Sequence, residues 1–161
     1  MVNPPIINAS PLIYLSRSNY LPLLQLFGPE ILVPQAVAQE IQHRDTQDPT
    51  VTALATTPWL RIVTPPEPDP LIQAWDLGKG ESAVLSWAYS HPDTEAILDD
   101  RAARRCAAAL NIPVRGTLGL VLIAKQRGEI SSARAVLEDL RRAGMYLSDS
   151  VLNQALAKIG E

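Results

Sequence analysis

The sequence contains a single cysteine, Cys106, and only two histidines, His43 and His91. One cysteine excludes an internal disulfide framework and a cysteine-based zinc site, and two histidines argue against histidine-rich metal chemistry. No apolar stretch reaches transmembrane length, and the N-terminus MVNPPIINAS lacks the basic segment and long apolar run of a signal peptide. We therefore expect a cytoplasmic protein that does not cross a membrane.

Basic residues are not in excess either, because 14 Lys and Arg stand against 17 Asp and Glu, which gives a formal net charge of −3. Nucleic-acid binding would therefore need a local basic patch instead of a global positive field. The basic residues cluster at Arg101–Arg105, at Arg115–Arg127 and at Arg141–Arg142, and many of them are expected on solvated helix faces. The 161 residues, 47% of them hydrophobic, fit one domain spanning 1–161 with a sizeable core.

Short and almost wholly apolar strands alternate with helices along the chain. The expected strands are Pro4–Asn8, Glu30–Pro34, Trp59–Val63, Glu95–Asp99 and Ile112–Gly116. The helix after the first strand has Ser10 as its expected N-cap and Pro11 in its first turn. This alternation predicts an α/β protein, a three-layer α/β/α domain with a parallel sheet of four to five strands. The apolar stripe Leu12–Leu24 either packs in its core or forms a dimer face.

Polar residues stand where the predicted strands end, the place where functional groups gather in parallel sheets. Asn8 ends the first strand, and Asp99 and Asp100 end the fourth. Glu81 lies in the first turn after the GKG bend, and Glu40 lies about two turns into the helix after the second strand. Three or four oxygen ligands suit Mg²⁺ or Mn²⁺. Such a cation would also relieve the repulsion between the adjacent carboxylates of the aspartate pair.

Each of these residues also has a purely structural interpretation. Glu81 could be a first-turn acid favoured by the helix dipole, and Glu40 could be a solvent-facing helix residue. Asp100 could cap the helix that begins at Arg101, and Asn8 could cap the turn into the helix that follows it. The metal site is the better prediction because every one of them falls near the expected end of an element.

Four segments resemble the PIN-domain superfamily of metal-dependent nucleases, and more narrowly a divergent prokaryotic branch known mostly as a domain of unknown function. They are INASPLIYL, GKGES, ILDDRAAR and VRGTLGLVLIAKQRG, and the resemblance extends from Ile6 to about Leu156. It implies a compact PIN-like parallel sheet with an acidic rim that binds one or two Mg²⁺ or Mn²⁺ ions, and it implies RNA as substrate. It also implies a homodimer and, as in many members, a toxin–antitoxin pair in which a small protein inhibits the toxin.

The resemblance also assigns roles to individual residues. By position, its metal ligands fall at Asn8, Glu40, Glu81, Asp99 and Asp100, with Asp100 favoured over Asp99. Ser10 matches a hydroxyl that orients the first ligand, and Thr117 matches a hydroxyl that faces the site from the fifth strand. The first acid of the family is usually aspartate, so Asn8 removes one negative charge and should weaken metal binding.

Together these observations predict a Mg²⁺- or Mn²⁺-dependent ribonuclease that hydrolyses phosphodiester bonds. Its catalytic residues would be Glu40, Glu81, Asp99 and Asp100. Arg101 and Lys79 would hold substrate phosphates, because the acids alone would repel RNA. The alternative is a PIN-like module that binds RNA or a protein partner without cutting, and the uncharged Asn8 favours it.

Two other protein classes that cluster acids at strand ends fit less well. A receiver-like domain needs an acceptor aspartate after the third strand, where this chain has the TPPEPDP loop. A phosphatase with an aspartate nucleophile needs two aspartates one residue apart after the first strand. Asn8 and Ser10 occupy those positions here.

Overall fold

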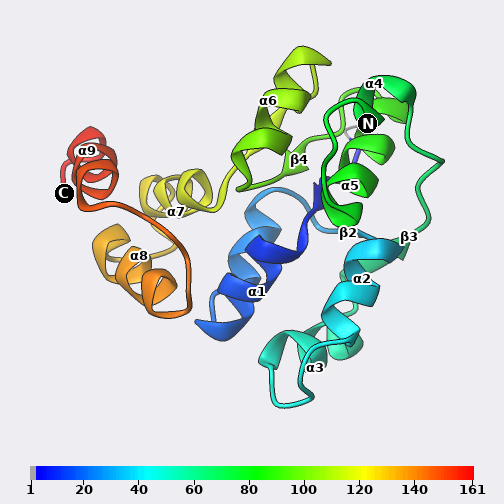
Figure 1. The fold of residues 1–161 in the computed structure, drawn as a ribbon. Coiled ribbons are helices and arrows are strands. Elements are labelled where there is room, and N and C mark those ends of the chain that lie inside the picture. Colours follow the sequence, from blue (N-terminus) through cyan, green and yellow to red (C-terminus); the bar gives the residue numbers. More distant parts are fainter. Residues whose placement is uncertain (1–2) are drawn as a thin grey trace.

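The computed structural model describes residues 3–161 and contains a five-stranded sheet flanked by helices (Figure 1). Its strands are β1 (Ile6–Ile7), β2 (Ile31–Pro34), β3 (Leu60–Val63), β4 (Ala96–Ile97) and β5 (Val114–Arg115). They lie in the order β3-β2-β1-β4-β5, and every neighbouring pair is parallel. The predicted three-layer α/β/α fold with a parallel sheet is confirmed, and the strands fall inside the predicted ranges.

Helices connect the strands and continue to the end of the described chain. They are α1 (Ala9–Arg17), the 3₁₀ helix η1 (Leu21–Leu26), α2 (Gln35–Gln42), α3 (Pro49–Thr56), α4 (Pro70–Gln73), α5 (Lys79–Ser90), α6 (Arg101–Ala109), α7 (Thr117–Gln126), α8 (Ala133–Arg142) and α9 (Asp149–Lys158). Figure 1 shows α7, α8 and α9 together on one side of the molecule, away from α2 and α3. No helix within residues 3–161 combines the length and the apolar character needed to cross a membrane.

The prediction that Ser10 caps α1 is wrong. The helix begins at Ala9, and Asn8 is its N-cap residue in an extended conformation, with no side-chain cap bond. The backbone N–H of Asn8 still donates to the carbonyl of Ile97 at 3.1 Å as part of the sheet. The chain therefore passes from strand to helix within a single residue, and this leaves the Asn8 side chain free for another partner.

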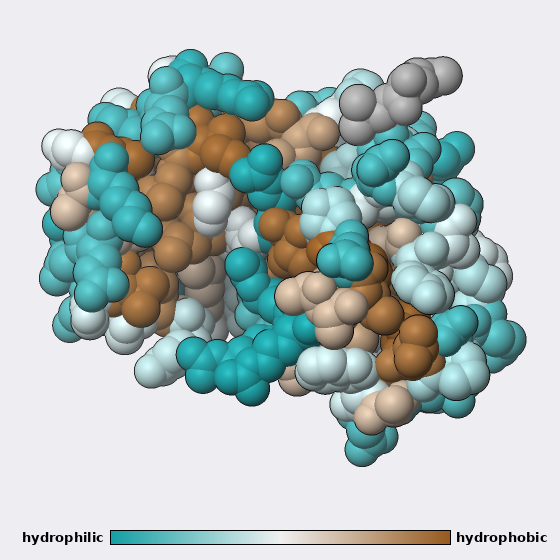
Figure 2. All heavy atoms as spheres, turned by 90° about the horizontal axis from the view of Figure 1, so that it is seen from above, coloured by the Kyte–Doolittle hydropathy of each residue, from teal (hydrophilic) through white to brown (hydrophobic). Residues whose placement is uncertain are grey.

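The apolar stripe Leu12–Leu24 packs in the core, because Leu12, Leu15 and Leu24 are all buried. The residues of β1, β2 and β4 are buried as well, as expected of central strands covered on both faces. Cys106 belongs to the same core, and its burial raises the pKa of the thiol. Figure 2 shows that the surface seen from above has apolar patches separated by hydrophilic side chains.

Candidate functional site

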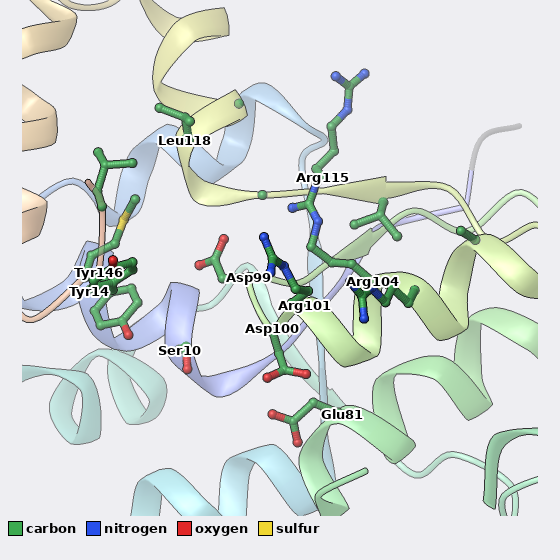
Figure 3. A pocket seen from close by; sticks show the side chains of 17 residues that line it. Ser10, Tyr14, Glu81, Asp99, Asp100, Arg101, Arg104, Arg115, Leu118 and Tyr146 are labelled. Atoms are coloured by element: carbon green, nitrogen blue, oxygen red, sulfur yellow. The ribbon is translucent and has the colours of Figure 1, made fainter. Parts of the chain in front are cut away.

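A cleft of about 910 Å³ opens where β4 and β5 end and α6 and α7 begin (Figure 3). The cleft therefore lies at the edge of the sheet where the carboxyl ends of the parallel strands meet. Among the residues predicted for a site, five line it: Ser10, Glu81, Asp99, Asp100 and Arg101. Elements far apart in the sequence thus bring three carboxylates to one place.

Asp99 is held by Thr117, the first residue of α7. The backbone N–H of Thr117 donates to its Oδ1 at 2.8 Å, and the Thr117 hydroxyl donates to its Oδ2 at 2.6 Å. Thr117 is fully buried at the first position of α7, so its two donors keep a fixed direction. Because both carboxylate oxygens are engaged, the plane of the Asp99 carboxylate is set by the start of α7.

Asp100 caps helix α6. Its Oδ2 accepts a hydrogen bond from the backbone N–H of Ala103 at 2.9 Å, and its backbone is extended, as the N-cap position requires. This is the structural alternative that the sequence offered for one of the two aspartates. The other oxygen, Oδ1, stays available to the cleft, which Asp100 also lines.

Glu81 pairs with Asn8. The Asn8 amide nitrogen donates to Glu81 Oε1 at 3.2 Å, across 73 residues of sequence, and Asn8 is only 3% exposed. The two glycines of the GKG bend make room for this pair. A Cβ at Gly78 would lie 2.6 Å from Glu81 Oε2, and one at Gly80 would lie 3.0 Å from Asn8 Oδ1. A side chain at either glycine would therefore displace a polar group of this pair.

Four residues predicted for the site do not line the cleft. Asn8 and Thr117 are buried and bond to two of its acids, whereas Glu40 and Lys79 make no such contact within residues 3–161. Glu40 is exposed on α2, whose buried residues Val37, Ala38 and Ile41 face the core. Lys79, the first residue of α5, is exposed and lines a second groove of about 510 Å³ beside the proline-rich loop 64–70. The structure therefore separates these two side chains from the three carboxylates of the cleft.

Arginines form another wall of the same cleft. Arg101, Arg104 and Arg105 line it from α6, and Arg115 lines it from β5. Arg104 Nη1 donates to the carbonyl of Leu98 at 3.0 Å. Arg115 makes an ion pair with Glu95 at 2.8 Å, and its guanidinium lies over the ring of Phe27. Positive charge at a cleft in a protein of net charge −3 suits an anionic ligand.

The donor chemistry of this cleft fits a hard divalent cation, because carboxylate oxygens are the ligands that Mg²⁺ and Mn²⁺ prefer. Within residues 3–161, however, no three His, Cys, Asp or Glu side chains are grouped closely enough to hold an ion. The three cleft carboxylates instead accept hydrogen bonds from Asn8, Thr117 and the backbone of Ala103. Each acid has a protein partner in the absence of metal.

Sequence reasoning missed several residues of the cleft. Arg104 and Arg105 were seen only as part of a basic cluster, although their spacing from Arg101 places all three on one helix face. Tyr14 and Tyr146 also line the cleft, and no local pattern in the sequence marked either one. Tyr146 comes from the segment between α8 and α9, whose place beside β4 and β5 depends on the whole chain.

Comparison with known proteins supports the resemblance drawn from the sequence. A family model described as a PIN domain matches residues 4–161. The match covers every strand of the sheet and every helix from α1 to α9. None of the curated proteins compared with the chain matches it.

Proposed function

This chain belongs to the PIN-domain family, and we propose that it is a Mg²⁺- or Mn²⁺-dependent ribonuclease that hydrolyses phosphodiester bonds in the cleft. One observation carries the proposal: Glu81, Asp99 and Asp100, from two separate elements, line a cleft that is also lined by arginines. Acids for a cation and cations for a phosphate are the two requirements of metal-assisted phosphodiester hydrolysis.

Glu81, Asp99 and Asp100 would hold the ion, and the family resemblance adds Asn8 and Glu40 to this set. A bound divalent ion would supply a water of lowered pKa and would polarise the scissile phosphate. The buried groups behind the acids act as orienting partners, since Asn8 fixes Glu81 and Thr117 fixes Asp99. In this proposal Ser10 supports the acids from the start of α1.

Arg101 would contact the phosphates of the substrate, because it lines the cleft and is exposed. Lys79 would contact RNA only where the strand continues into the second groove, which that lysine lines. The arginine side chains also offset the repulsion between the acids and the RNA backbone. In this proposal the acids hold the metal ion, and the basic side chains position the substrate.

The test is cleavage of labelled single-stranded and structured RNA by the purified chain with Mg²⁺ or Mn²⁺, compared with the same reaction in EDTA. Cleavage should require the metal and should be lost in a Glu81→Ala, Asp100→Ala double variant. Glu129→Gln is the matched control, because Glu129 is exposed and lies outside the cleft. Cleavage that persists in the double variant would remove this function.

A second candidate is a PIN module that binds RNA or a protein without cutting. It is favoured by Asn8, whose neutral amide satisfies Glu81 without a cation, and by the lack of a three-acid group within residues 3–161. In that case the chain should bind RNA and should not cleave it in Mg²⁺ or Mn²⁺. An Asn8→Asp variant should bind RNA and still show no cleavage, whereas a cleavage rate that appears in this variant would favour the nuclease.

The toxin role, the small inhibitory partner protein and the homodimer complete the proposal. All three rest on the family resemblance alone. Arrest of bacterial growth on expression of the wild-type chain, relieved in the Glu81→Ala, Asp100→Ala variant, would support the toxin role. Sedimentation equilibrium of the purified chain would establish whether it forms a dimer. Unimpaired growth would contradict the toxin role, and a monomer at all concentrations would contradict the homodimer.

A further inference from the structure

Tyr146 is the most exposed large apolar or aromatic residue in the described chain. Its side chain is 91% exposed, and it lines the same cleft as the three acids. No hydrogen bond to its hydroxyl group is found within residues 3–161. An aromatic ring presented almost entirely to water, at the mouth of a charged cleft, is the arrangement by which proteins stack an unpaired base.

The backbone that carries this ring is held in place from several sides. Met145 and Leu147, on either side of Tyr146, are both buried. The Met145 N–H donates to the carbonyl of Leu140 at 3.0 Å, and Arg17 Nη1 donates to the carbonyl of Ala143 at 3.2 Å. The ring is therefore presented on a fixed support, so that little backbone freedom is lost when a ligand stacks on it.

The arginines of α6 supply the second observation. Arg101, Arg104 and Arg105 stand at positions i, i+3 and i+4, so they share one helix face, and they line the cleft. None of the three makes an ion pair within residues 3–161. Like charges at this spacing destabilise a helix, and a positive charge in its first turn opposes the helix dipole. An anionic ligand would relieve both effects.

The two features lie on opposite sides of Asp99. In Figure 3 the Asp99 carboxylate lies between Tyr14 and Tyr146 on one side and the arginines Arg101 and Arg104 on the other. An RNA strand whose phosphates follow the arginines therefore passes Asp99 before one of its bases reaches Tyr146. A folded protein partner would fit this cleft less well, because the cleft combines one highly exposed ring with α6 arginines that make no ion pair within residues 3–161.

We propose that Tyr146 is a base-stacking residue of this cleft, which contacts an unpaired base of an RNA strand whose phosphates Arg101 and Arg105 hold. Stacking on a side chain requires a base that is not paired within a duplex. This inference rests on the proposed function only in taking RNA as the ligand. It adds the residue that contacts a base and the arginines that hold the phosphates.

The test is a fluorescence-anisotropy titration of the full chain, in EDTA, with a labelled unstructured oligoribonucleotide and with the same strand annealed to its complement. Wild type should bind the single strand more tightly than the duplex. Tyr146→Ala should weaken single-strand binding about 5- to 150-fold, the equivalent of roughly 1–3 kcal/mol for one stacked base. It should leave duplex binding unchanged, and Tyr146→Phe should restore the affinity because the ring is retained.

Matched controls separate stacking and charge from general damage. Tyr89→Ala removes another exposed tyrosine, which lies on α5 outside the cleft, and it should leave binding unchanged. Arg105→Gln should lower the salt dependence of single-strand binding by about 0.7 in the slope of log K against log salt. Arg134→Gln, an exposed arginine on α8, should not change that slope.

The possible failures can be told apart. Equal loss of single-strand and duplex binding in Tyr146→Ala, or no loss at all, overturns the inference even if the chain cleaves RNA. A Tyr146→Ala variant that loses self-association in sedimentation while it keeps RNA affinity assigns the ring to a protein contact and also overturns it. Selective single-strand binding without cleavage in Mg²⁺ or Mn²⁺ supports the inference and removes the proposed ribonuclease. A lack of RNA binding at low salt would contradict both the role of Tyr146 and the proposed ribonuclease.

Discussion

Asp48 links the end of α1, the segment after α2 and the start of α3, so its charge should be one of the most sensitive points of the fold. Its Oδ2 accepts hydrogen bonds from Arg17 Nη2 at 3.0 Å and Arg44 Nε at 2.8 Å. Its Oδ1 accepts from the N–H and the hydroxyl of Thr50, at 3.0 and 2.8 Å, as the N-cap of α3. The Asp48→Asn variant keeps an oxygen for Thr50 but removes the negative charge that faces the two guanidinium groups.

The expected loss can be worked from these contacts. A hydrogen bond to a charged group is worth about 1.5–3 kcal/mol, and two such bonds are weakened in Asp48→Asn. The Asp48 side chain is 7% exposed, but those of Arg17 and Arg44 are 35% and 36% exposed, so solvent screens part of the gain. We expect a destabilisation of about 2 kcal/mol, which for a chain of this size lowers Tm by roughly 4–8 °C.

The loss should depend on pH in a defined direction. Burial by itself raises the pKa of Asp48, but the hydrogen bonds from Arg44, Thr50 and Arg17 outweigh it and leave the pKa well below its usual range. Because the folded-state pKa is lowered, the stabilisation is present above the unfolded pKa of about 3.9. It is lost as the pH falls through the folded pKa. The gap between wild type and Asp48→Asn should therefore be largest near neutral pH and narrow in acid.

Urea denaturation at a series of pH values from neutral to about 3 measures this gap, with the pH limits set by the reference pKa of aspartate. Asp45→Asn is the control, because Asp45 is exposed and its side chain accepts a bond only from the N–H of Gln47 among the described residues. A difference in the free energy of unfolding between wild type and Asp48→Asn below about 0.5 kcal/mol at neutral pH would be that of an ordinary surface substitution. That result, or a gap that stays constant in acid, would refute the reasoning.

Three further predictions concern other buried or crowded polar groups. Thr117→Val removes the hydroxyl that donates to Asp99 and should cost about 2 kcal/mol in urea denaturation, while Thr117→Ser should retain most of that stability. Gly116→Ala places a Cβ against Arg104 Nη1, so it should cost about 1 kcal/mol through the displaced guanidinium. A double-mutant cycle should show that this cost disappears in an Arg104→Ala background. The Tyr20 hydroxyl donates to a carboxylate of α8 at 2.7 Å, which together with burial and that charge raises the pKa of Tyr20. Stability should therefore fall as the pH rises above about 10, less so in Tyr20→Phe, as followed by denaturation in alkaline buffers.

The alternation of apolar strands and helices was sufficient to predict the fold, because the period of burial is a local property of the sequence. The helix that was not predicted is α4, which begins at a proline. No helix was predicted directly after the TPPEPDP loop, but Asp69 caps α4 by accepting a bond from the N–H of Leu71 at 2.9 Å, and Pro70 is the first helical residue. Proline at that position is compatible with a helix, and the sequence signal for α4 was therefore present.

The site could be predicted only in part, since the direction of a side chain depends on elements remote in sequence. Asp99 and Asp100 follow β4, so their place at the sheet edge was implied by the parallel order. The hydrogen bond between Asn8 and Glu81 could not be predicted in this way, because it depends on how α5 packs against β1, and the two elements are far apart in the sequence. Tyr146 depends in the same way on how the α8–α9 segment returns to the cleft.

Asn8 places a neutral hydrogen-bond donor beside Glu81, one of the acids of the cleft. Its amide nitrogen lies 3.2 Å from Glu81 Oε1, a distance at which an aspartate carboxylate would repel Glu81 unless a cation lay between them. The Asn8 amide replaces that repulsion with a hydrogen bond, and the Thr117 donors do the same for Asp99. Glu81 and Asp99 are thus oriented by protein donors. For the proposed ribonuclease we therefore expect cleavage that depends on a divalent metal, together with RNA binding that does not require one.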